Sequence, residues 1–137
     1  MCITLNQSQL IAEAAKTKAT EIGVPMNIAI VDEGANIKFF LRMDNAMLGS
    51  ADIALKKART SSLFNQDSGD IGRLSQSGGP LHDIEQTNGG LVSFPGGIVI
   101  KNDAGKIIGA IGVSGGAVDE DYQVAAAGVA AIDVRKK

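Results

Sequence analysis

The stretch MNIAIVDEGANIKFFLRM, residues 26–43, decides the fold that we expect for this chain. It holds two runs rich in β-branched and aromatic residues, Met26–Val31 and Ile37–Met43. Between them, Asp32–Asn36 supplies the residue types that make turns. Two strands joined by so short a connection pair antiparallel as a hairpin. The stretch therefore predicts an antiparallel sheet.

A second hairpin is expected further along the chain. Gly97–Lys101 and Lys106–Val113 read as strands, and Asn102–Gly105 is a turn between them. Gly109 and Gly112 stand inside the second strand. Glycine weakens a strand, but it permits another backbone to approach closely.

Three segments have the apolar spacing of helices. The first begins at a capping box, Thr4–Gln7, and ends before Gly23. Ser50 is the expected N-cap of the second, and Asp119–Asp121 places negative charge on the first turn of the last. The expected ranges are 5–22, about 50–64, and the C-terminal segment from Asp119.

The segment from Gln66 to Gly90 lacks periodicity and is rich in glycine, serine and turn pairs. Short helical turns are expected around 71–76 and 81–86. An irregular stretch of this length within a small domain is typical of a binding loop or an interface element.

These elements predict one α+β domain over residues 1–137, with an antiparallel sheet of four to five strands and flanking helices. In outline this is similar to profilin-like and PAS-like folds. The chain is 45% hydrophobic, which is ordinary for a globular protein that buries one core.

Composition excludes several partners. The net charge is −2, and no basic run exceeds Arg135–Lys137, so we expect no nucleic-acid binding. The single cysteine, Cys2, fits a reducing compartment. The sequence has no apolar run long enough to span a membrane and no leader pattern. We therefore expect a cytoplasmic protein.

His82 is the only histidine, and it lies within the irregular segment. A neutral imidazole is a common ligand of haem iron, and Asp83 or Glu85 could hold its second nitrogen. With one histidine, a zinc site built from several histidines is excluded. The alternative is a partly exposed loop histidine with no ligand.

Arg42 and Asp44 follow the end of a predicted strand. An arginine there can grip a carboxylate, such as a propionate, with two hydrogen bonds. The alternative is an arginine–aspartate pair that fixes the turn. Ser114-Gly115-Gly116, before the last helix, is a candidate anion-binding nest, with turn-making as the alternative.

Other polar groups carry weaker hypotheses. Lys56, Lys57 and Arg59 read as a solvated face of the second helix or as part of a subunit contact. Asp32 with Asp44 could be a pair of carboxylates for acid–base chemistry. A serine–histidine–aspartate triad has no supporting motif.

Four motifs occur together along the chain: Val31–Gly34, Arg42–Ala46, Ala54–Thr60 and Gly109–Gly116. In combination they resemble the GlcG/HbpS family, which also supplies the C-terminal domain of PduO-type corrinoid adenosyltransferases. The resemblance runs from about Thr4 to Gly128. It implies a profilin-like fold, a homo-oligomer that is often an octamer, and haem binding in some members. Other members accompany genes of glycolate, glycerol or propanediol metabolism. The positions carried over from the family are Arg42, Asp44, Lys57, Gly115 and Gly116.

The leading hypothesis is an oligomeric protein that binds haem or a related tetrapyrrole beside the irregular segment. His82 is the expected iron ligand, and Arg42 would meet a propionate. Met43, Met47 and Tyr122 are weaker ligand candidates. The alternatives are a cofactor-free accessory subunit of a metabolic operon, and an enzyme that acts on haem or on a small hydroxy-acid.

Overall fold

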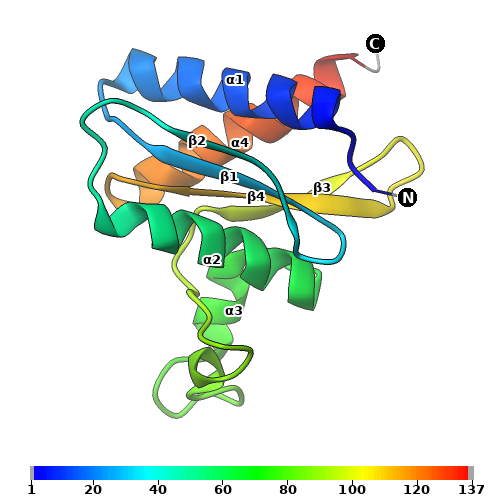
Figure 1. The fold of residues 1–137 in the computed structure, drawn as a ribbon. Coiled ribbons are helices and arrows are strands. Elements are labelled where there is room, and N and C mark those ends of the chain that lie inside the picture. Colours follow the sequence, from blue (N-terminus) through cyan, green and yellow to red (C-terminus); the bar gives the residue numbers. More distant parts are fainter. Residues whose placement is uncertain (1, 136–137) are drawn as a thin grey trace.

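The computed structural model describes the backbone of residues 2–135 and the side chains of residues 2–132. Its four strands form one antiparallel sheet in the order β2-β1-β4-β3 (Figure 1). This confirms the expected α+β class with a four-stranded sheet. The elements are α1 (Leu5–Ile22), β1 (Asn27–Asp32), β2 (Ile37–Arg42), α2 (Gly49–Phe64), α3 (Ser68–Leu74), the 3-10 turn η1 (Ile84–Gln86), β3 (Gly97–Lys101), β4 (Ile107–Ser114) and α4 (Val118–Arg135).

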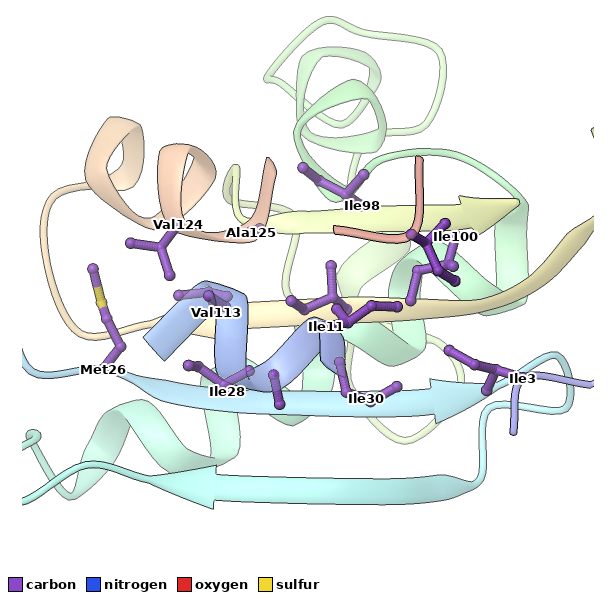
Figure 2. Packing of buried hydrophobic residues seen from close by; sticks show 14 of the residues in the cluster. Ile3, Ile11, Met26, Ile28, Ile30, Ile98, Ile100, Val113, Val124 and Ala125 are labelled. Atoms are coloured by element: carbon purple, nitrogen blue, oxygen red, sulfur yellow. The ribbon is translucent and has the colours of Figure 1, made fainter. Parts of the chain in front are cut away.

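The sheet lies between two unequal layers of helix. Helices α1 and α4 cover one face and α2 covers the other (Figure 1). Because side chains alternate along a strand, Ile28 and Ile30 face α1 and α4, whereas Ala29 and Val31 face α2. Figure 2 shows the first of these layers, which is packed mainly with isoleucine and valine.

The layer against α2 is thin because its residues are small. A Cβ atom added to Gly112 would lie 2.0 Å from the carbonyl oxygen of Ala54 and 2.6 Å from the nitrogen of Ala58. The backbones of β4 and α2 therefore nearly touch at this glycine. The close backbone approach predicted for Gly112 is confirmed.

The structure confirms the predicted start of α1 and corrects the predicted start of α2. Thr4 and Gln7 form the expected capping box, and Gly23 ends α1 in the left-handed conformation. Ser50 is not the N-cap of α2. The helix begins at Gly49, and Ser50 is buried in its first turn. The amides of Ser50 and Ala51 donate to the carbonyls of Met47 and Leu48, so helical turns already begin before Ser50.

The irregular middle segment projects from the body beyond α2 as an extension that contains α3 and η1 (Figure 1). These two short helices correspond to the turns expected near 71–76 and 81–86. Glu85 holds the extension together, since its carboxylate accepts hydrogen bonds from the hydroxyls of Ser75 and Ser93. Across the described residues, none of the helices combines the length and apolar character needed to cross a bilayer.

Candidate functional site

A groove of about 600 Å³ lies between the C-terminal half of α1 and the end of β2. Two cations, Arg42 and Lys16, line it beside an apolar wall that includes Leu41 and Met43. Basic residues beside apolar surface suit a ligand with carboxylates on a hydrophobic frame, and the ammonium of Lys16 also lies 3.0 Å from the carboxylate of Glu13. The full lining is Lys16, Ala19, Thr20, Gly23, Val24, Pro25, Leu41, Arg42, Met43 and Asp44.

The strand pattern places these lining residues on two faces of the sheet. Leu41 and Met43 pack toward the layer of α1 and α4, whereas Arg42 alternates to the other side. Met43 continues the ladder past β2, because its amide donates to the carbonyl of Met26 at 3.0 Å. The amide of Met26 in turn donates to the sulfur of Met43 at 3.3 Å. The thioether of Met43 is therefore already occupied.

Arg42 and Asp44 are both exposed, and the described residues contain no ion pair between them. The alternative in which this pair fixes the turn is therefore not what the structure shows. The guanidinium of Arg42 is available to a ligand.

His82 lies on the extension, and it lines neither this groove nor the second, smaller one beside Phe94. Its side chain is 53% exposed, and its Nε2 atom lies 3.5 Å from a carboxylate oxygen of Asp83. Glu85 is used by Ser75 and Ser93, and those hydroxyls lower the pKa of Glu85. Neither of these two grooves therefore contains both His82 and Arg42.

The structure corrects the interpretation of Lys57. It is neither on a solvated face nor at a subunit contact, because its side chain is only 1% exposed. Its ammonium lies 2.9 Å from a carboxylate oxygen of Asp121 and donates to the carbonyl of Val113 at 2.9 Å. Burial lowers the pKa of Lys57. This group ties α2 to the start of α4 and faces no groove among those described.

The glycine turn before α4 is occupied by the chain's own carboxylates. The amide of Gly116 donates to Asp121, and the amide of Ala117 donates to Glu120, each at 2.9 Å. An anion would have to displace these groups to use the nest. For Gly115 and Gly116 the geometry favours the turn-making interpretation.

Asp32 also has a structural task. Its Oδ1 atom accepts hydrogen bonds from the amides of Gly34 and Asn36 and so shapes the hairpin turn. Asp44 lies at the opposite end of the hairpin, beyond the end of β2. The hypothesis of a carboxylate pair formed by Asp32 and Asp44 is wrong for this chain.

The sequence did not predict two of the residues that form the groove and the buried ion pair. Lys16 reaches the groove of Arg42 from α1, and Asp121 is the partner of Lys57. Lys16 and Thr20 stand one turn apart on α1, which is the only pattern that marks a shared polar stripe. Across the described residues, no cluster of three or more histidine, cysteine or acidic side chains could hold a metal ion.

Comparison with known proteins places this chain in a defined family. The family described as "Haem degrading protein HbpS-like" matches residues 3–130, and the chain belongs to this family. A 15.0 kDa protein from the dhaT–dhaS intergenic region of Citrobacter freundii is 42% identical over 90% of this chain and 87% of its own length. Corrinoid adenosyltransferase PduO of Citrobacter freundii is 32% identical over 98% of this chain, which spans only 40% of that protein.

Solved structures agree with this assignment. Klebsiella pneumoniae protein ORFY has a TM-score of 0.92 and 36% identity, over 96% of this chain and 90% of its own. A structure of a PduOC–haem complex has a TM-score of 0.91 and 30% identity, over 97% of this chain and 96% of its own. The helices and strands described above are thus those of a fold whose relatives include a haem complex.

Proposed function

We propose that this chain binds haem or a related tetrapyrrole as a homo-oligomer. The observation that carries the proposal is the likeness to the PduOC–haem complex, which extends over nearly the whole of both chains. The 42% identical relative is named for its position between dhaT and dhaS, and we extend the proposal to a role beside small-molecule catabolism.

The donor groups of this chain suit the two ends of such a ligand when different copies in the oligomer supply them, because Arg42 and His82 share neither groove within one chain. Arg42 and Lys16 border a groove with an apolar wall, which matches propionates attached to a hydrophobic ring. The imidazole of His82 is half exposed and can reach an iron atom without unfolding. When bound, haem supplies a redox-active iron with an intense Soret absorption.

The other ligand candidates differ in availability. Met43 is engaged by the amide of Met26, whereas Met47 is 60% exposed and Tyr122 is 44% exposed. Met47 also lies near Arg42, since Asn27 pairs across the sheet with Arg42 and donates from its side chain to the carbonyl of Met47. His82 remains the proposed ligand because imidazole binds haem iron more generally than thioether does, and Met47 is the competitor to test.

Hemin titration of the purified protein, followed by the Soret band, tests the proposal. We expect a shifted Soret band in the wild type, loss of that shift in His82→Ala, and no change in Met47→Ala. Arg42→Ala should keep the band position but weaken affinity by about tenfold, the value of a charge-assisted hydrogen bond. A spectrum identical to free hemin refutes haem binding, and a band lost in Met47→Ala instead refutes His82.

The competing proposal is a cofactor-free accessory subunit. The observation that favours it is the exposure of large apolar side chains, with Leu48 77% and Phe94 54% exposed. An oligomer that shows no Soret shift with hemin would support this function over the first.

A further inference from the structure

The two edges of the sheet differ in whether side chains bind their outer backbone groups. At β3, the outer edge is capped by side chains, because the amides of Gly97 and Val99 donate to the hydroxyl of Ser68 and the carboxylate of Asp67. At β2, no described side chain caps the outer edge, and Figure 2 shows β2 at the margin of the sheet with β1 on its inner side only. An unpaired edge is a template for another strand.

The ladder identifies the free groups. Met43 bonds inward to Met26, so alternation along the strand turns the backbone N–H and C=O groups of Phe40 and Arg42 outward. On the strand's first half, a bulge leaves Lys38 without a partner on β1, since Ile30 pairs with Phe39 and Val31 with Ile37. The regular part of the edge is therefore 39–43, and its midpoint is Leu41.

We propose that this edge pairs antiparallel with the same edge of a second copy, about a two-fold axis at Leu41. The inference rests on the oligomer part of the proposed function and names its interface. Joining the two β2 strands makes one continuous sheet from both copies. The identical edge satisfies the free backbone groups of Phe40 and Arg42.

Side-chain chemistry selects this register. Centring on Leu41 places Leu41 opposite itself and Phe40 opposite Arg42 of the second copy, an arrangement that suits a cation over an aromatic ring. It also places Phe39 opposite Met43 and Lys38 opposite Asp44 of the second copy. Within 39–43 every opposed pair is apolar, sulfur–aromatic or cation–aromatic, and Lys38 and Asp44 place opposite charges just outside this segment.

The neighbouring register is unfavourable. Centring on Phe40 would oppose Lys38 to Arg42 on both sides of the axis, and like charges directly opposite destabilise a strand pair. The charges of Lys38, Arg42 and Asp44 thus favour the register centred on Leu41 and disfavour the register centred on Phe40.

The pairing would also change the candidate site. The groove is lined by Leu41, Arg42, Met43 and Asp44, the residues at the proposed axis. Joining two copies there brings both grooves to one interface and sets Phe40 of the second copy beside Arg42. The partner copy thereby places an aromatic side chain next to Arg42, one of the residues that line the groove.

Cysteine cross-linking tests the register in a Cys2→Ser background. Opposed residues have Cβ atoms about 4.5–5.5 Å apart and diagonal ones about 7–8 Å, and a disulfide needs about 4 Å. We expect Leu41→Cys to form covalent dimers on mild oxidation, and Phe40→Cys alone to form none. A mixture of Phe40→Cys and Arg42→Cys chains should give only mixed dimers.

A charge swap tests the same interface without cysteine. Lys38→Glu or Asp44→Lys alone should raise the dimer Kd by about tenfold in ultracentrifugation, and the double variant should restore it. A wild type that sediments as a monomer at high micromolar concentration overturns the proposal, as does Phe40→Cys that cross-links by itself as fast as Leu41→Cys. Hemin titration of the Lys38→Glu variant keeps this result separate from haem binding, because a Soret shift there leaves that proposal standing whatever the interface.

Discussion

The ion pair of Lys57 and Asp121 is buried on both sides, with side chains 1% and 3% exposed. Each charge has further hydrogen bonds, from Lys57 to the carbonyl of Val113 and from the amide of Gly116 to Asp121. Burying two charges is costly, so such a pair adds little net stability, but removing one partner leaves the other charge stranded. The pair therefore matters most when it is broken.

Replacing Lys57 by methionine should destabilise the protein by about 3–5 kcal/mol, because the carboxylate of Asp121 loses its cation while it stays buried. The double variant Lys57→Met with Asp121→Asn should recover much of this loss, since a neutral amide can still accept the hydrogen bond from Gly116. Urea unfolding of the single and double variants measures both values. Equal stabilities of Lys57→Met and wild type would contradict the structural role of the pair.

The position of Lys57 shows where the sequence pattern misleads. The apolar residues Ala51, Leu55 and Ala58 indicate one buried face of α2, with Lys57 outside it. The buried set is instead largely polar: Ser50, Ala54, Lys57, Ala58, Thr60, Ser61 and Ser62. Hydropathy cannot reveal that Lys57 belongs to it, because its partners, the carbonyl of Val113 and the carboxylate of Asp121, are distant in sequence.

At the scale of elements, local chemistry predicted the sheet well. The β3 range agrees at both ends, and the other strands agree within about one residue at each end, because β-branched runs and turn residues are local signals. The extension has no such signal, since tertiary hydrogen bonds to Glu85 organise it. For the same reason the sequence predicted Arg42 as an available cation but not that His82 lies apart from its groove.

The extension should be sensitive to acid through Glu85. Its hydrogen bonds lower the pKa of Glu85 below the ordinary value of 4.5, so the folded state binds fewer protons there than the unfolded chain does. The stabilisation is therefore present above about pH 4.5 and is lost as the pH falls through the lowered pKa. In Glu85→Gln the extension should be less protected than in wild type at neutral pH, and the difference should vanish in strong acid.

Amide hydrogen exchange of residues in α3 and η1 at several pH values measures this effect. Asp83→Asn is the matched control, because Asp83 is an exposed acid in the same segment whose carboxylate lies 3.5 Å from Nε2 of His82 and accepts no bond from Ser75 or Ser93. The Glu85→Gln difference persisting unchanged below pH 3 would show that the carboxylate charge does not stabilise the extension.

At the scale of the whole molecule, the two layers respond to added volume in opposite ways. The layer of α1 and α4 is packed with branched side chains that can adjust their rotamers, whereas α2 meets the sheet through alanine and glycine backbone. Backbone atoms on a helix cannot move individually. The spacing of the thin layer is therefore set by glycines that lack a Cβ atom, since a Cβ would lie 2.0 Å from the carbonyl oxygen of Ala54 at Gly112 and 2.5 Å from that of Lys57 at Gly97.

Gly112→Ala should accordingly destabilise the protein by about 3 kcal/mol or more, the upper range for overpacking, because its Cβ would overlap the backbone of Ala54 and Ala58. Gly49→Ala is the matched control at the start of the same helix, where an added Cβ meets no atom within 4 Å. That change should be neutral or stabilising by about 0.4–1 kcal/mol, since it reduces the freedom of the unfolded chain. Thermal or urea unfolding compares the two, and a Gly112→Ala protein as stable as Gly49→Ala would mean that α2 can move away from the sheet as a unit.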